Sequence, residues 1–155
     1  MCYLSTLFDV LPDAKVIWTH RDPVKSIPSY ASLLSLSQRS LFGEYDPKQI
    51  GKAVIDIYRV GIDRDLTYRK TSSVGNQILD IHCHQIAPNP LQIMELVCDF
   101  VGHSFVEAER DRVNKWLTAK RTEKNGSHQY EMSEFGLNKE QIHKEFEDYF
   151  QMVLQ

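Results

Sequence analysis

The stretch AKVIWTHRDPVKSIPSYAS, residues 14–32, decides the fold. Its first half, KVIWTH, is typical of a short buried strand, and Asp22 followed by Pro23 supplies the N-cap and the first position of a helix. The helix therefore begins directly after the strand. Arg21 is fixed at the carboxyl end of that strand, beside the positive end of a helix dipole, and open α/β sheets bind ligands at this edge.

Ser29 stands seven residues after Asp22, which is close to two helical turns and places its hydroxyl on the face of the N-cap. Arg21 and Ser29 would then offer a planar cation and a hydroxyl to one phosphate-sized anion. In the alternative interpretation, Arg21 pairs with Asp22 or another surface acid and Ser29 faces solvent. Spacing alone leaves both interpretations open. Pro28 removes an N–H inside this helix and predicts a kink there.

The rest of the chain alternates between strand and helix patterns. The segment QILDIHCHQ, residues 77–85, predicts a second strand. This order of elements, in which each of two strands is followed by helices, predicts an α/β domain with a parallel strand pair. The apolar spacing predicts six helices. The first stops near Pro12–Asp13, the second runs from Pro23 through Leu36, and the third covers 46–70. The fourth runs from Pro90 to a Gly102 C-cap, the fifth covers about 106–119, and the last follows an Asn138 N-cap.

Composition narrows the class of protein. The 155 residues suit one domain, and 18 Lys and Arg against 21 Asp and Glu give a net charge of −3, so no general basic field attracts nucleic acid. Three cysteines, an odd number, favour a reducing compartment. The run His82–Cys83–His84 lacks a second ligand pair, so no metal is expected. No apolar run approaches the ~20 residues of a membrane span, and no signal peptide is evident, which predicts a soluble cytoplasmic protein.

Three segments carry a resemblance to a known family. LPDAKVIWTHRDPVKSIPSYASL (11–33) resembles the 3′-phosphate-binding segment of sulfotransferases that use 3′-phosphoadenosine 5′-phosphosulfate (PAPS), closest to the broad family found in bacteria and animals. ILDIHCHQIAPNPLQIMELVCDFVG (78–102) is similar to the second strand of that family and the helix after it. KNGSHQYEMSEFGLNKEQIHKEFEDYF (124–150) is similar to its closing loop and last helix. The resemblance therefore covers nearly all of the chain.

The resemblance implies a P-loop-NTPase-like α/β fold and a single, partial sulfotransferase domain over 1–155. Arg21 and Ser29 would bind the 3′-phosphate of PAPS, with no metal. A basic loop at 120–128 would close over that phosphate with Lys124, the backbone around Gly126 and, less securely, Arg121. Glycine permits close backbone approach and lysine adds a cation; a solvated surface lysine is the alternative for Lys124.

Two features depart from the family pattern. The second strand of the family commonly offers a tyrosine near the adenine, where this sequence has Cys83 between two histidines. The family also opens with a strand, a Gly-rich phosphate loop and a helix that hold the 5′-phosphosulfate, and no glycine here follows a strand ahead of residue 14. We therefore expect the C-terminal part of a sulfotransferase, truncated at the N-terminus, whose unpaired sheet edge favours self-association.

The implied function is transfer of a sulfonate group from PAPS to a hydroxyl or amine acceptor, with this chain supplying the 3′-phosphate half. No residue matches the catalytic base of the family. His20 is the nearest candidate by position, although a structural role or a hydrogen bond to the phosphate suits a histidine at a strand end beside an arginine better. The alternatives are an inactive nucleotide-binding domain and a protein-interaction domain derived from the same fold. The partners would be the nucleotide and an acceptor that the sequence does not identify.

Overall fold

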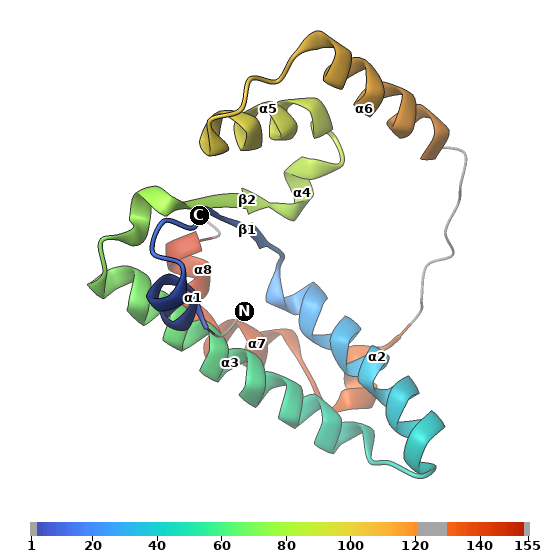
Figure 1. Cartoon of the computed structure of the whole chain (residues 1–155). Helices are drawn as coiled ribbons and strands as arrows, with labels where there is room; N and C mark the ends of the chain where they lie inside the picture. The colour runs from blue at the N-terminus through green and yellow to red at the C-terminus, as the bar shows by residue number, and fades with distance from the viewer. Residues whose placement is uncertain (1–2, 121–129, 154–155) are drawn as a thin grey trace. The chain divides into compact units, whose positions relative to one another are not determined.

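The computed structural model describes residues 3–120 and 130–153. The chain divides into two compact units, of which unit 1 holds residues 1–14, 21–75 and 129–155 and unit 2 holds residues 15–20 and 76–128. The prediction of one partial domain stays a prediction. The elements, coloured along the chain in Figure 1, are α1 (Leu4–Val10), β1 (Val16–His20), α2 (Pro23–Phe42), α3 (Pro47–Thr71), η1 (Val74–Gln77), β2 (Ile78–His82), α4 (Cys83–Ile86), α5 (Pro90–Val101), α6 (Glu107–Lys120), η2 (Met132–Phe135), α7 (Lys139–Glu145) and α8 (Glu147–Val153).

Unit 2 is built on the predicted parallel strand pair. β1 and β2 run parallel in register from Val16 opposite Ile78 to His20 opposite His82. The predicted second strand extended to residue 85, and this bound was wrong, because α4 begins at Cys83. A strand needs a partner for its backbone groups. β1 ends at His20, so within the described ranges the residues after His82 have no strand to pair with, and they form a helix.

Local signals fix the helices of unit 2. α5 begins at Pro90 and ends before Gly102, whose φ of 81° is the left-handed C-cap that the sequence predicts. The Lys15 ammonium donates to the Phe100 carbonyl at 2.5 Å and so ties the start of β1 to the end of α5. Arg110 of α6 pairs with Glu95 of α5, which joins these two helices.

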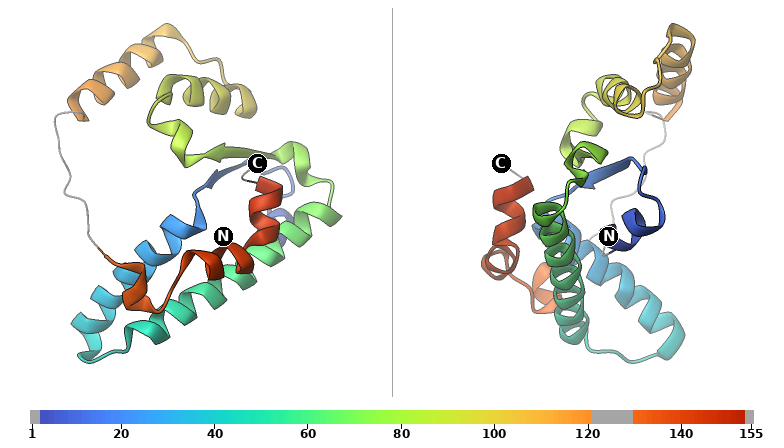
Figure 2. Two further views of the ribbon diagram at one scale, coloured as in Figure 1. Left: turned by 180° about the vertical axis from the view of Figure 1, so that it is seen from behind. Right: turned by 60° about the vertical axis from the view of Figure 1, so that its left-hand side comes forward.

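Unit 1 is organised around the helices α2 and α3, which lie side by side and run in opposite directions (Figures 1 and 2). Asp22 caps α2 and Asp46 caps α3, each accepting a hydrogen bond from the N–H two residues on. α2 continues through Pro28 to Phe42, beyond its predicted extent, and the predicted kink stays a prediction. The apolar core of the unit comes from these helices, from α1 and from the C-terminal segment: Leu4, Phe8, Ile27, Ala31, Val54, Ile55, Leu66, Phe135, Leu137, Ile142, Phe146, Tyr149 and Val153 are buried.

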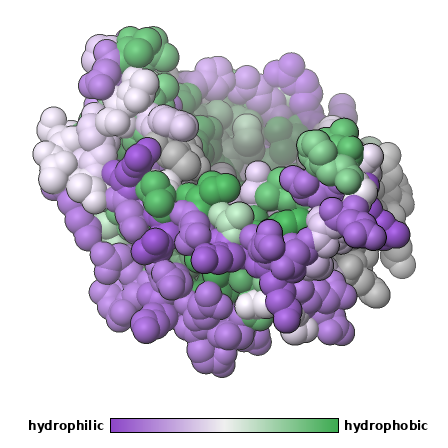
Figure 3. All heavy atoms as spheres, turned by 90° about the horizontal axis from the view of Figure 1, so that it is seen from below, coloured by the Kyte–Doolittle hydropathy of each residue, from purple (hydrophilic) through white to green (hydrophobic). Residues whose placement is uncertain are grey.

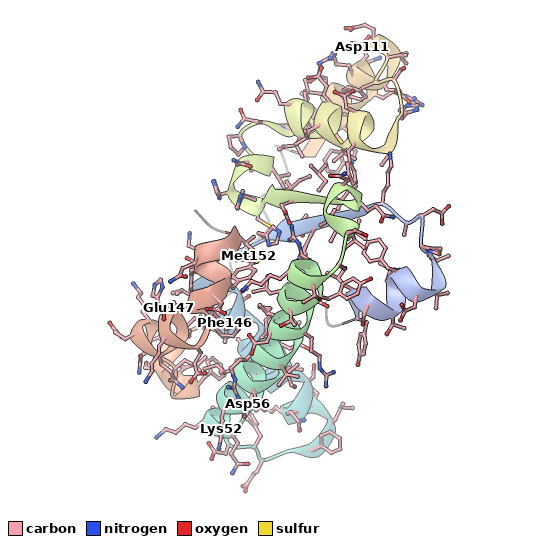
Figure 4. The ribbon with its side chains drawn as sticks, turned by 90° about the vertical axis from the view of Figure 1, so that its left-hand side faces the viewer. Lys52, Asp56, Asp111, Phe146, Glu147 and Met152 are labelled. Atoms are coloured by element: carbon pink, nitrogen blue, oxygen red, sulfur yellow. The ribbon has the colours of Figure 1, made fainter. Side chains whose placement is uncertain are left out.

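The C-terminal segment of unit 1 begins its helix as predicted and then breaks it. The Asn138 side chain accepts from the Gln141 N–H at 2.7 Å, which confirms the N-cap. The single last helix predicted from the apolar stripe is wrong, because α7 ends at Glu145, with Phe146 as its C-cap, and α8 begins at Glu147. Phe146, labelled in Figure 4 where α7 meets α8, is only 3% exposed. The apolar stripe continues across this position, and the backbone leaves the helical conformation at Phe146, with φ −118° and ψ 24°.

Several large apolar side chains of α2 remain exposed, among them Leu33, Leu36, Leu41 and Phe42. On the face shown in Figure 3, hydrophilic side chains make up most of the surface and hydrophobic ones emerge between them. Across the two described ranges, no helix is both long enough and apolar enough to cross a membrane. Self-association through a sheet edge stays a prediction.

A buried carboxyl joins α1 to α3 within unit 1. Asp65 of α3 is 2% exposed, and its Oδ1 accepts the Leu4 N–H at the start of α1 at 3.1 Å. Its Oδ2 is buried and has no hydrogen-bond partner among residues 3–120 and 130–153. Burial raises the pKa of the Asp65 carboxyl, and the Leu4 hydrogen bond offsets part of that effect.

The raised pKa of Asp65 predicts that this residue makes the protein less stable as pH rises. The folded chain holds the Asp65 proton to a higher pH than the unfolded chain does, so its contribution is complete below the ordinary Asp pKa and falls as pH rises through the raised value. Asp65→Asn removes this loss while keeping an acceptor for Leu4. Chemical unfolding from pH 3 to pH 8 should show the stability of Asp65→Asn rising relative to wild type as pH increases.

The matched control for this experiment is Asp56→Asn, an exposed aspartate of the same helix (Figure 4). It makes the same chemical change at an exposed position of α3, so the pH dependence that is specific to the buried site is the difference between the two variants. A flat difference for Asp65→Asn would show that the Asp65 carboxyl ionises as freely in the folded chain as in the unfolded one.

Candidate functional site

The candidate site is the N-terminal turn of α2, where every backbone donor is already used. Pro23 has no N–H, and the Val24 N–H is bonded to Oδ1 of Asp22 at 2.8 Å. The N–H groups of Lys25 and Ser26 both donate to the Asp22 carbonyl at 2.9 Å. The turn therefore offers an anion its dipole, and side chains must supply the direct hydrogen bonds.

Arg21 lies immediately before this turn with its side chain exposed. In the described residues, the Arg21 guanidinium forms no ion pair or hydrogen bond, so the pairing with Asp22 that the sequence left open does not occur. Asp22 instead uses its carboxylate to cap α2. A guanidinium carries five donors in a planar fork that matches a phosphate, so Arg21 retains all of its capacity to bind one.

Ser29 differs from four of the other five serines of α2. Four of them, Ser26, Ser35, Ser37 and Ser40, donate their hydroxyls to the carbonyl four residues earlier. Ser29 is half-buried and its hydroxyl forms no hydrogen bond with the described residues. It therefore has both a donor and acceptor capacity left for a ligand.

The carbonyl that Ser29 would use belongs to Lys25, and another hydroxyl occupies it. Tyr130 Oη donates to the Lys25 carbonyl at 3.3 Å, across 105 positions of sequence. Tyr130 is not among the residues that the sequence assigned to the site. The signal that could have indicated it was its place in the His-x-Tyr part of the segment that resembles the closing loop.

His20, the candidate base by position, is occupied in the interior of unit 2. Its side chain is 1% exposed, and its Nε2 lies 2.7 Å from Oδ1 of Asp80. Its ring lies 5.1 Å from that of Trp18 and 5.9 Å from that of His82. A fully buried imidazole held by a carboxylate cannot reach an acceptor in solvent, so this geometry assigns His20 a structural role.

At the carboxyl end of β2, His82 and His84 form a ring pair with centroids 5.5 Å apart. His84 is exposed and Cys83 is half-buried in α4.

The remaining predicted site residues, Arg121, Lys124 and Gly126, lie outside the described residues, and their assignment stays a prediction. The chain is described again from Tyr130, which contacts the first turn of α2. Of the five predicted residues, the structure thus describes Arg21 and Ser29, and it places both in unit 1.

Comparison with known proteins bears on the whole chain. A profile described as "Sulfotransferase family" matches residues 1–107. The fold is similar to that of sulfotransferase STF9 from Mycobacterium avium, with a TM-score of 0.83 and 23% identity over 97% of this chain. It is also similar to that of sulfotransferase STF1 from Mycobacterium tuberculosis H37Rv, with a TM-score of 0.68 and 27% identity over 92% of this chain. No curated protein matches.

The matched part of each solved relative is limited. This chain spans 38% of the STF9 chain and 36% of the STF1 chain. The helices and the small parallel sheet described for this protein are thus the counterpart of just over a third of those enzymes.

Proposed function

This chain belongs to the sulfotransferase family, and we propose on that basis that it provides the part of a sulfotransferase that binds the 3′-phosphate of PAPS. Arg21 would bind two oxygens of the phosphate through its guanidinium, and Ser29 would donate its hydroxyl to a third. The dipole of α2 would add favourable potential at the same place. Lys124, Arg121 and the backbone at Gly126 would complete the contacts.

The observation that carries this proposal is the pair of unused groups at one helix N-terminus. The Arg21 guanidinium and the Ser29 hydroxyl form no hydrogen bond with the described residues, so both keep donors that the oxygens of a phosphate can accept. A different anion, such as inorganic sulfate, would use the same donors, so the proposal must be tested with the nucleotide itself.

The reaction we infer for the complete enzyme is sulfonate transfer to a hydroxyl or amine. PAPS supplies the sulfonate: its sulfur–oxygen bond to the 5′-phosphate breaks, a bond from sulfur to the acceptor forms, and a base takes the acceptor proton. Arg21 and Ser29 act on the far phosphate, where they orient the nucleotide and leave the chemistry to other groups. We assign no catalytic residue to this chain.

The experiment that tests the proposal is calorimetric titration with adenosine 3′,5′-bisphosphate and with adenosine 5′-monophosphate, which lacks the 3′-phosphate. Ser29→Ala should weaken binding of the bisphosphate by about 1 kcal/mol, or roughly fivefold, because one neutral donor is lost. It should leave binding of the monophosphate unchanged.

The matched control is Ser37→Ala on the same helix, whose hydroxyl already donates to the Leu33 carbonyl. It should change neither affinity. Equal losses for both nucleotides in Ser29→Ala would show that Ser29 acts on a part of the nucleotide other than the 3′-phosphate. A wild-type chain that binds both nucleotides equally would rule out a 3′-phosphate site.

A further inference from the structure

We propose that Tyr130 is a positioning residue that keeps the Ser29 hydroxyl available for the ligand, an inference that rests on the proposed 3′-phosphate site. The premise is the behaviour of the serines on α2. Ser26, Ser35, Ser37 and Ser40 all turn their hydroxyls back onto the carbonyl four residues earlier, with distances from 2.9 to 3.3 Å. Such bonding satisfies the hydroxyl but removes its donor from any ligand.

Ser29 would follow the same pattern if its carbonyl were open. A carbonyl oxygen has two lone pairs. In a regular α-helix the carbonyl of residue 25 serves the N–H of residue 29, which uses one of them. Tyr130 Oη donates to the same oxygen at 3.3 Å and so competes with the Ser29 hydroxyl for it. Ser29, whose hydroxyl forms no hydrogen bond with the described residues, is therefore a serine whose partner carbonyl already accepts from a tyrosine 105 positions away.

In this arrangement the hydroxyls of Tyr130 and Ser29 have different roles. In the proposed role, the Tyr130 hydroxyl donates a hydrogen bond to the Lys25 carbonyl and contacts no ligand atom. The Ser29 hydroxyl does not donate to that carbonyl and is available to a ligand. The Lys25 carbonyl is still satisfied, because it accepts from Tyr130. Without the Tyr130 hydroxyl, the Ser29 side chain should rotate so that its hydroxyl donates to the Lys25 carbonyl. The ligand would then have to break that hydrogen bond before Ser29 could donate to it.

The test is Tyr130→Phe, which removes one oxygen and keeps the ring. We expect its affinity for adenosine 3′,5′-bisphosphate to fall about three- to tenfold, the usual effect of one neutral hydrogen bond. In a Ser29→Ala background the same change should have less than a twofold effect, because no Ser29 hydroxyl remains to be positioned. Crystal structures without nucleotide should show the Ser29 Oγ turned to the Lys25 carbonyl in Tyr130→Phe and turned away from it in the wild type.

The control is Tyr45→Phe, an exposed tyrosine after the other end of α2, which should leave the affinity unchanged. A tyrosine with a purely structural role would lower thermal stability and reduce affinity equally with and without Ser29, and that result would overturn the inference. So would an unchanged affinity in Tyr130→Phe when Arg21→Ala weakens binding. If Arg21→Ala has no effect either, the 3′-phosphate site itself is refuted, and the role of Tyr130 with it.

Discussion

Replacing Arg21 by alanine is expected to weaken binding of adenosine 3′,5′-bisphosphate by about 2–4 kcal/mol, because two charge-assisted hydrogen bonds to phosphate are lost together. This corresponds to a loss of affinity of roughly 30- to 1000-fold. The effect should be far larger than that of Ser29→Ala, which removes one neutral donor. Calorimetry on both variants measures the ratio directly.

The structure indicates that Arg21→Ala should not disturb the fold. Its side chain is exposed and forms no bond with the described residues, so its loss leaves no buried group unsatisfied. The melting temperature without ligand should therefore match that of the wild type, while the shift produced by the bisphosphate should shrink. An unchanged ligand-induced shift, with a lowered melting temperature, would assign Arg21 a structural role instead.

Arg39→Ala is the matched control, since it removes an equal charge from the last turn of α2. Arg39 lies about 24 Å along the helix axis from Pro23, the first residue of α2, at 1.5 Å per residue. Arg39→Ala should leave the affinity within a factor of two. An equal loss in both variants would mean that the nucleotide responds to the total charge of the protein and that no local site exists.

Gly51→Ala is expected to have the largest effect on stability, a loss of about 3 kcal/mol or a fall in melting temperature of roughly 6–12 °C. Gly51 lies in α3 against η2, and a Cβ there would overlap the Phe135 carbonyl oxygen and lie 3.0 Å from the Phe135 Cβ. The clash is with backbone, which cannot rotate away, and Phe135 is 4% exposed. Thermal unfolding followed by circular dichroism measures the change.

Helix propensity works in the opposite direction at this position. Alanine favours a helix interior over glycine by about 1 kcal/mol, so an open site would make Gly51→Ala stabilising. Gly75→Ala is the control, because a Cβ at Gly75 meets no atom within 4 Å. A Gly51→Ala variant as stable as the wild type would show that α3 and η2 do not pack as closely as described.

Gly51 also shows what the sequence alone does not explain and the tertiary structure does. From the sequence, Gly51 is a helix residue that costs stability, and nothing near it in the chain explains its presence. The explanation is Phe135, 84 positions away. The break at Phe146 is similar, because the apolar stripe continues across it and nothing in the local sequence marks the end of α7.

The sequence by itself determined the features that depend on neighbours within a turn or two. Asp22 and Asn138 cap helices because each side chain reaches an N–H two or three residues on, and Gly102 ends a helix because it alone tolerates its φ. The placement of Arg21 directly before α2 follows from the same local rules. The family resemblance rests on these segments, and the sulfotransferase profile confirms it.

Only the tertiary structure decided the contacts between distant segments. The bond from Leu4 to Asp65 spans 61 positions and that from Tyr130 to Lys25 spans 105. The end of β2 at His82 depends on where β1 stops. A periodic pattern records which face of a helix is apolar, and it carries no record of which distant carbonyl, carboxylate or ring that face will meet. The availability of Ser29 is therefore a tertiary property, although its spacing from Arg21 can be read from the chain.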